Sequence, residues 1–183
     1  MRFLLPLNSQ LTTFFTCNMA VKNGILDIMR LTVNTVEETQ TLAARLAKLV
    51  QPGDTILLNG DLGAGKTTFT QGLARALGIR RPLKSPTFTL VREYQTENFP
   101  LYHLDVYRLG EEGGGDELGL AEYFGGEGVA LIEWSEFIQS ELPQDVLIID
   151  LARLDQDETG LLRTISVRAT GPRSEAILAA LEK

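Results

Sequence analysis

The sequence predicts an α/β fold: three layers around a mixed sheet that ends in an antiparallel hairpin. Three observations lead to this prediction. Short apolar runs alternate with segments of helical periodicity, which is typical of a sheet covered by helices. A glycine-rich segment at 60–67 lies between an apolar run and a helical one. Two β-rich runs, 145–154 and 161–169, flank a polar turn and are typical of a hairpin.

The first predicted strand and helix follow each other directly. Leu31–Val33 is a short apolar run, and Thr35 with Glu38 forms a T-x-x-E capping box that starts a helix. We expect the helix to continue to about Val50. Its apolar residues recur at helical spacing and form one inward-facing stripe: Leu42, Leu46, Leu49 and Val50. Pro52–Asp54 predicts the turn that follows.

The segment at 60–67 fits G-x-x-x-x-G-K-[ST], the pattern of a P-loop. In such loops backbone N–H groups surround phosphate oxygens, the lysine neutralises the β- and γ-phosphates, and the last hydroxyl ligates Mg²⁺. The expected context is present: a strand at 55–58, a helix at 68–77, and Gly78 as its stop. The expected nucleotide-binding residues are Gly60, Asp61, Leu62, Gly63, Ala64, Gly65, Lys66, Thr67 and Thr68. The apolar face of the helix is expected to comprise Phe69, Leu73, Ala76 and Leu77.

The remaining elements are predicted from apolar runs and breaker residues. Strands are expected at 88–91, 101–105 and 129–133, before the hairpin. Helices are expected at 118–124, at 135–142 with Ser135 as its cap, and at 174–181, and the glycines of 110–115 predict a loop.

Two predicted strands end in a carboxylate, at Asp105 and Glu133. Ligands of α/β sheets gather at the carboxyl ends of parallel strands, and Mg²⁺ prefers oxygen ligands. One acid is therefore expected to bind the metal while the other polarises the attacking water, or one of them forms only a structural pair, and the spacing does not decide between these roles. Thr87, in Ser-Pro-Thr-Phe, is a candidate switch residue that closes on Mg²⁺ and the γ-phosphate, or a turn residue only.

Two residue types occur once each near these acids. His103 is expected to be packed rather than catalytic, because a metal site would need further histidines or cysteines nearby. Trp134 directly follows Glu133 and lies either near the nucleotide or in the core.

Composition excludes several classes of function. The formal net charge of −7 argues against a broad direct grip on nucleic acid, although it leaves room for a local basic patch. A single cysteine, Cys17, excludes an internal disulfide and fits a reducing, cytoplasmic setting. No apolar run approaches the length of a membrane span.

Residues 1–29 differ in composition from the rest. No Asp or Glu occurs before residue 26, and the apolar residues are scattered among polar ones. A signal peptide would need a longer apolar segment, and a transit peptide more Arg and Ser. We therefore expect a poorly ordered extension or a start assigned too early, with Met19 and Met29 as later starts. Residues 30–183 are expected to form one P-loop ATPase domain.

Absent motifs narrow the nucleotide chemistry. The chain lacks the N-K-x-D pattern that selects guanine, the L-S-G-G-Q pattern of transporter ATPases, and an arginine-rich lid. ATP is therefore the favoured nucleotide and hydrolysis the favoured reaction.

Four segments in order carry a resemblance to a known family: 60–69, 84–91, 102–109 and 132–136. Together, at these spacings, they resemble the bacterial TsaE family, formerly YjeE, of small ATPases needed for threonylcarbamoyladenosine modification of tRNA. The likeness covers about residues 31–154. It implies ATP and Mg²⁺ as ligands and TsaB and TsaD as partners, with tRNA contacted only through that complex. TsaE would drive repeated turnover of the complex without performing the transfer itself.

The resemblance also implies residue roles. Thr67 and Glu133 would ligate Mg²⁺, and Asp105 would be the acid near the metal or the γ-phosphate. Thr87 would lie in a switch-like loop, Thr35 near the base, and Trp134 close to the nucleotide. Lys66, Asp105 and Glu133 are the residues expected to carry catalysis.

Two other functions use the same P-loop. A small-molecule kinase would show an acceptor-dependent rate. A regulatory module would bind ATP without turnover.

Overall fold

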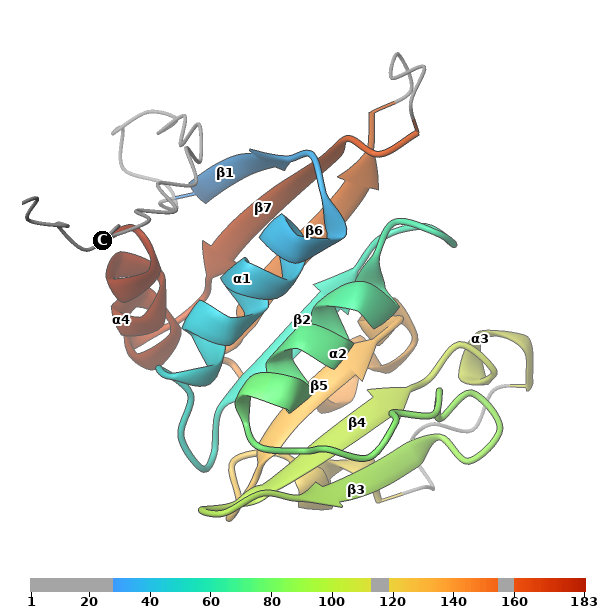
Figure 1. The fold of residues 1–183 in the computed structure, drawn as a ribbon. Helices are drawn as coiled ribbons and strands as arrows, with labels where there is room; N and C mark the ends of the chain where they lie inside the picture. The colour runs from blue at the N-terminus through green and yellow to red at the C-terminus, as the bar shows by residue number, and fades with distance from the viewer. Residues whose placement is uncertain (1–27, 113–118, 155–159) are drawn as a thin grey trace, which may run out of the picture.

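The computed structural model describes residues 28–112, 119–154 and 160–183. The strands within these ranges are β1 Ile28–Val33, β2 Thr55–Asn59, β3 Val91–Gln95, β4 Pro100–Asp105, β5 Val129–Glu133, β6 Leu147–Arg153 and β7 Arg163–Ala169. They form one sheet in the order β1-β7-β6-β2-β5-β4-β3 (Figure 1). The central pairs β6–β2, β2–β5 and β5–β4 are parallel, and the outer pairs β1–β7, β7–β6 and β4–β3 are antiparallel. The predicted α/β fold with a mixed sheet and a C-terminal hairpin is confirmed.

Helices cover the two faces of the sheet unequally. The helical elements are α1 Val36–Ala47, α2 Lys66–Ala76, α3 Leu109–Glu112, the 3₁₀ helices η2 Leu120–Tyr123 and η3 Ser135–Glu141, and α4 Pro172–Leu181. Buried residues of α1, α2 and α4 share one core cluster, and those of η2 and η3 share the other. Figure 1 shows α1 and α2 in front of the strands. The third layer of the predicted fold is thus built from 3₁₀ turns and loops.

The two core clusters are separated by the pleat of the central strands. Every residue of β5 is buried, as expected for a strand covered on both faces. Leu131 packs on the α1 and α2 side, whereas Ile132 packs on the η3 side. Each such side chain stabilises the fold by about 1.5–3 kcal/mol through its burial. The alternation leaves Glu133, at the end of the strand, on the α2 side with Leu131.

A glycine lets α1 and α2 approach each other closely. A Cβ atom added to Gly72 would lie 2.8 Å from the Cα of Gln40, which is nearer than a real carbon contact permits. The contact holds α2 against α1 and so helps to fix the axis of the helix that begins at the P-loop.

The start of α1 confirms the predicted cap and changes one detail of it. The Thr35 hydroxyl accepts from the Glu38 N–H at 3.1 Å, as in a capping box. The reciprocal bond differs, since the Glu38 carboxylate accepts from the N–H of Asn34 at 2.6 Å. The helix also ends at Ala47 rather than near Val50, because the chain tightens into a turn in which the Leu49 N–H donates to Leu46.

Two predictions around α2 and β3 were wrong. Ala76 is exposed, while Ala74 is buried in the same row as Thr70. The strand expected at 88–91 is a turn up to residue 90, and β3 starts only at Val91. The turn closes through a 2.7 Å bond from the Thr89 N–H to Pro86, and Leu90 then has a φ of 59°, which no strand residue adopts.

Two of the three predicted short helices are 3₁₀ helices, while the third, expected at 174–181, is the α-helix α4, Pro172–Leu181. The expected helix at 118–124 is η2, and Leu118 lies outside the described residues. Ser135 is not the cap of η3, because Trp134 occupies that position with a φ of 63°. The hydroxyl of Ser135 instead donates to Asn59 at 3.2 Å, which joins η3 to the end of β2.

Several predicted segments lie partly outside the description. The expected glycine loop contains the single turn α3, and residues 113–118 are outside the described ranges. Most of the hairpin turn, 155–159, and the expected extension up to residue 27 also lie outside the described ranges. Met29 already belongs to β1, which starts two residues before the predicted domain boundary. Among the described residues, no helix combines the length and the apolar character needed to cross a lipid bilayer.

Candidate functional site

The P-loop lies at the carboxyl end of the central strand β2 and leads directly into α2. Gly60, Gly63 and Gly65 all have φ between 80° and 139°, a region that favours glycine. The crowding is greatest at Gly60, where an added Cβ would lie 2.3 Å from the carbonyl oxygen of Leu151 on β6. The glycines of the motif are therefore required by the path of the backbone.

A cavity of about 570 Å³ opens over this loop. Its walls come from the P-loop, α2, the segment before β3, and the ends of β4 and β5. The lining residues are Leu62, Gly63, Gly65, Lys66, Thr67, Thr68, Ser85, Thr87, Asp105, Tyr107, Glu133 and Trp134. The volume is in the range of small-molecule sites.

Lys66 is the first residue of α2, and its side chain folds back over the loop. Its ammonium group donates to the carbonyl of Gly60 at 2.5 Å and to that of Asp61 at 3.2 Å. It also lies 4.4 Å from the centre of the Trp134 ring, which adds a cation–π attraction. A buried cation held by carbonyl oxygens and a π-face is well placed to exchange these weaker partners for a phosphate.

The two strand-end acids lie side by side. Asp105 of β4 is opposite Glu133 of β5 in the parallel register, and both are buried. Asp105 accepts from the Thr87 hydroxyl and, at 3.2 Å, from the N–H of Tyr107. Glu133 contacts His103 instead. Each acid therefore has its own set of orienting partners.

The contact of His103 with Glu133 is a residue role that the sequence prediction missed. Nε2 of His103 is 2.9 Å from a carboxylate oxygen of Glu133, while Nδ1 is buried and has no partner among the described residues. An orphan N–H would be costly, so the proton belongs on Nε2, where it is donated to Glu133. Part of the signal was available, because residues two apart on a strand share a face, and His103 is two residues before Asp105, but the pairing of β4 with β5 was not.

The Ser85–Thr87 segment ties the loop before β3 to this site. The hydroxyls of Ser85 and Thr87 are 2.6 Å apart, and Ser85 reaches Asp105 at 3.5 Å. Thr87 thus contacts Asp105, and Ser85 joins it, while the expected closing of Thr87 on Mg²⁺ and the γ-phosphate stays a prediction.

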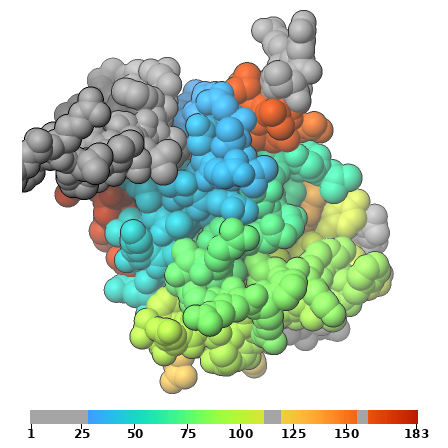
Figure 2. Space-filling view, viewed as in Figure 1, coloured from blue at the N-terminus to red at the C-terminus, as the bar shows by residue number. Residues whose placement is uncertain are grey.

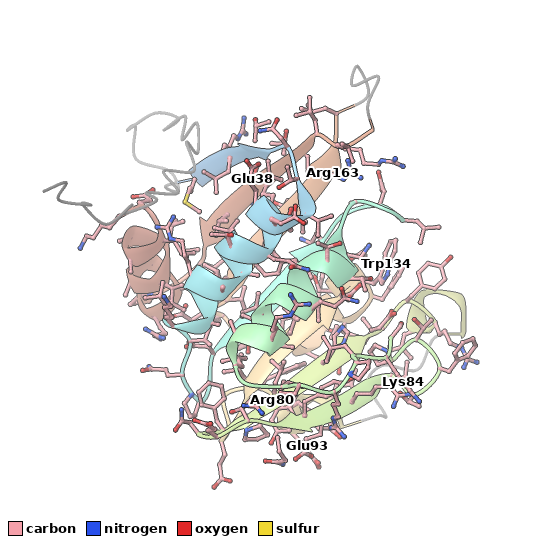
Figure 3. The ribbon with its side chains drawn as sticks, viewed as in Figure 1. Glu38, Arg80, Lys84, Glu93, Trp134 and Arg163 are labelled. Atoms are coloured by element: carbon pink, nitrogen blue, oxygen red, sulfur yellow. The ribbon has the colours of Figure 1, made fainter. Side chains whose placement is uncertain are left out.

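Aromatic rings form the opposite wall. Trp134 and Tyr107 pack edge-to-face with centroids 5.0 Å apart, and Tyr107 also contacts Phe137 at 6.5 Å. The left-handed backbone of Trp134 turns its ring back over Lys66. Figure 3 shows Trp134 at the end of the sheet where the P-loop lies.

Most of the predicted site residues meet at the cavity. Four predicted residues do not line it: Thr35, Gly60, Asp61 and Ala64. Gly60 and Asp61 still contribute, since their carbonyls hold Lys66. Ala64 is buried beneath the loop, and Thr35 caps α1, so the expected role of Thr35 near the base stays a prediction. Tyr107 lines the cavity and was not predicted.

The donor set fits magnesium rather than a softer metal. Thr67, Asp105 and Glu133 present hydroxyl and carboxylate oxygens in one cavity. In the described part of the chain, no group of three or more His, Cys, Asp or Glu side chains forms an all-protein metal site. Magnesium does not need one, because it takes one or two protein oxygens and completes its shell with phosphates and water.

A phosphate-binding loop on the central strand, with acids on a neighbouring strand and on the strand beyond it, defines this chain as a P-loop protein. A family model described as "Threonylcarbamoyl adenosine biosynthesis protein TsaE" matches residues 33–162. The chain therefore belongs to the TsaE family.

Curated relatives and a solved structure agree with this assignment. The chain is 48% identical over 147 residues to the tRNA threonylcarbamoyladenosine biosynthesis protein TsaE of Bacillus subtilis, covering 80% of this chain and 89% of that protein. It is 43% identical to the protein of the same name from Rickettsia felis, over 70% of this chain and 75% of the relative. The crystal structure of Bacillus subtilis YdiB superposes with a TM-score of 0.74 at 40% identity, covering 87% of this chain and 97% of YdiB.

Proposed function

We propose that this chain is a Mg²⁺-dependent ATPase required for tRNA threonylcarbamoyladenosine modification. In this proposal, ATP binding and hydrolysis drive turnover of a complex of the TsaB and TsaD proteins. The observation that carries the proposal is the meeting of Lys66 and Thr67 with Asp105 and Glu133 around one cavity. Family membership supports the link to the tRNA modification.

The P-loop side chains are assigned to the phosphates. Lys66 exchanges the carbonyls of Gly60 and Asp61 for β- and γ-phosphate oxygens and neutralises their charge. The loop N–H groups and the start of α2 add partial positive charge at the same place. Trp134 packs against the nucleotide from the opposite wall.

The oxygen donors are assigned to the metal and to water. Thr67 and Glu133 hold Mg²⁺, which supplies charge neutralisation at the phosphates when bound. His103 keeps the Glu133 carboxylate oriented. Asp105 positions the attacking water or a water of the metal, and its bond to Thr87 makes the switch loop sensitive to what occupies the cavity.

We assign the partners from the family. TsaB and TsaD contact the ATPase, and tRNA reaches it through them, in the cytoplasm. A partner-supplied group completing the site would make hydrolysis slow in the isolated protein.

The test is steady-state ATP hydrolysis by the purified protein, alone and with TsaB, TsaD and unmodified tRNA. We expect a low rate that rises when the partners are added and that is lost in Glu133→Ala. Equal rates with and without partners would contradict the coupling. ATP binding without any turnover would favour the regulatory module, and a rate that depends on a phosphoryl acceptor would favour the kinase.

A further inference from the structure

A second groove lies beside the edge strand β3, away from the P-loop. It has a volume of about 590 Å³ and is lined by Arg81, Pro82, Lys84, Thr89, Val91, Arg92, Glu93 and Tyr94. Its three cations stand out in a chain whose formal net charge is −7. In Figure 3, Lys84 and Glu93 lie beside β3.

The groove is a defined part of the fold. Arg81 lies 4.8 Å from the centre of the Tyr94 ring and donates to the carbonyl of Glu93 at 3.0 Å. The hydroxyl of Tyr94 bonds to both the N–H and the carbonyl of Lys84, each at 3.2 Å. These contacts hold the segment before β3 against the strand, and the Lys84 side chain remains exposed. Figure 2 shows the green segment of this region on the molecular surface.

The same contacts restrict what the groove can bind. β3 is the last strand of the sheet among the described residues, so its outer edge would be open to an added strand. Arg81 occupies the carbonyl of Glu93 on that strand, and the fastened segment runs alongside it. Main-chain pairing with a peptide is therefore disfavoured, and recognition is left to the three cationic side chains.

We propose that this groove binds the phosphate backbone of RNA directly, a contact in addition to the indirect one through TsaB and TsaD proposed above. Each guanidinium or ammonium group that lines the groove can contact a phosphate, and such contacts fix position rather than read sequence. Glu93 in the same groove disfavours a densely acidic protein surface packing flat against it, whereas spaced phosphates can contact the cations and avoid it.

The groove is linked to the nucleotide cavity through one loop. Lys84 and Thr89 line the groove, while Ser85 and Thr87 between them line the cavity and contact Asp105. Arg92 of the groove also reaches the carbonyl of Ser85 at 3.5 Å. RNA bound by Lys84 would therefore affect the position of the loop that carries Thr87. This coupling rests on the proposed ATPase function, whereas RNA binding itself does not.

The test measures binding of a fluorescent, unmodified tRNA transcript to the full chain by anisotropy over a series of salt concentrations. Three phosphate contacts predict a slope of log K against log[salt] of about −2 to −3. We expect Lys84→Glu to weaken binding by about tenfold at low salt and to reduce the slope by about 1. Its matched control is Lys48→Glu, an exposed lysine outside the groove that makes the same change in charge.

Three results would overturn the inference. They are unchanged binding in Lys84→Glu, an equal loss in Lys48→Glu, and tighter binding of polyglutamate than of tRNA, which would indicate an acidic protein partner. Arg92→Gln provides a second, milder variant, and thermal unfolding of each variant shows whether it is folded. Loss of tRNA binding in Lys84→Glu while ATP hydrolysis remains intact would support the groove as the RNA-binding site. ATP hydrolysis that is absent while tRNA still binds contradicts only the proposed ATPase.

Discussion

The imidazole of His103 donates to the carboxylate of Glu133 over 2.9 Å, from the neighbouring strand and below the floor of the cavity. Both side chains are at least nine-tenths buried. The pair therefore acts as a unit: the histidine restricts the rotamers of the acid that we assign to the metal. Partners of this kind orient metal ligands without touching the metal.

Replacing His103 tests this positioning role. We expect His103→Leu to lower kcat for ATP hydrolysis by about 10- to 100-fold, since Glu133 loses its orienting donor. His103→Gln, which keeps an N–H donor on a side chain of similar length, should retain more of the rate. Binding of ATP without Mg²⁺ should change little in either variant. Equal kcat values in the two variants would contradict a role that depends on the donor.

Lys66→Ala removes the cation at the centre of the P-loop. We expect ATP hydrolysis and the partner-dependent tRNA modification to be lost, because no other buried cation among the described residues lines the cavity. The fold should persist, since among the described residues the Lys66 ammonium donates only to carbonyls of its own loop and otherwise contacts the Trp134 ring. Circular dichroism checks the fold, and undiminished modification would contradict the assignment.

Gly72→Ala tests the contact between α1 and α2. Alanine favours a helix by about 1 kcal/mol over glycine, but its Cβ would meet the backbone of Gln40 at 2.8 Å. Overpacking should dominate and lower the free energy of unfolding by about 1–3 kcal/mol. Gln71→Ala, at an exposed position on the same helix, is the control and should be nearly neutral. Chemical denaturation measures both, and a stabilised Gly72→Ala would show that the helices can move apart.

Asp145 gives stability a pH dependence at the start of α4. Its carboxylate accepts from the N–H groups of Arg173 at 2.7 Å and Ser174 at 2.9 Å. Burial alone would raise the pKa of Asp145, but hydrogen bonds from Ser174 and Arg173 and the charge of Arg173 outweigh it and hold the pKa below its ordinary value. The stabilisation is therefore complete above about pH 4, the unfolded value, and is lost as the pH falls through the lower folded value.

The variant Asp145→Asn isolates this effect. It should cost about 1–3 kcal/mol at neutral pH, because one accepting oxygen becomes an NH₂ group facing an N–H donor. Below about pH 4 the difference in the free energy of unfolding between the wild-type protein and Asp145→Asn should become smaller. Thermal unfolding across this pH range measures it. A constant gap down to pH 2 would mean that Asp145 titrates alike in the folded and unfolded chain.

The sequence predicted most of the site because its signals are local. The P-loop needs glycines at particular backbone positions, and the two acids directly follow apolar strands, so the sequence singled out Lys66, Asp105 and Glu133, which line one cavity. The contact of His103 was missed because it joins two strands whose adjacency is set by the sheet order. The prediction of a strand at 88–91 was wrong because a local turn, closed by the bond from the Thr89 N–H to Pro86, overrides the apolar pattern there.

The order of strands in space differs from their order along the chain, and this has a consequence for folding. Among the described strands, β1 pairs only with β7, which is the last of them along the chain. The strands that carry the P-loop and the two acids all precede Leu147. The residues of the site are therefore synthesised before β7, which completes the sheet. During translation, β1 therefore stays without its partner until residues beyond 160 have left the ribosome, and the closing step pairs residues that are 130 to 140 positions apart. Such non-local closure is slow relative to local pairing. The final β1–β7 pairing is thus the step at which we expect a newly made chain to be most exposed to misfolding.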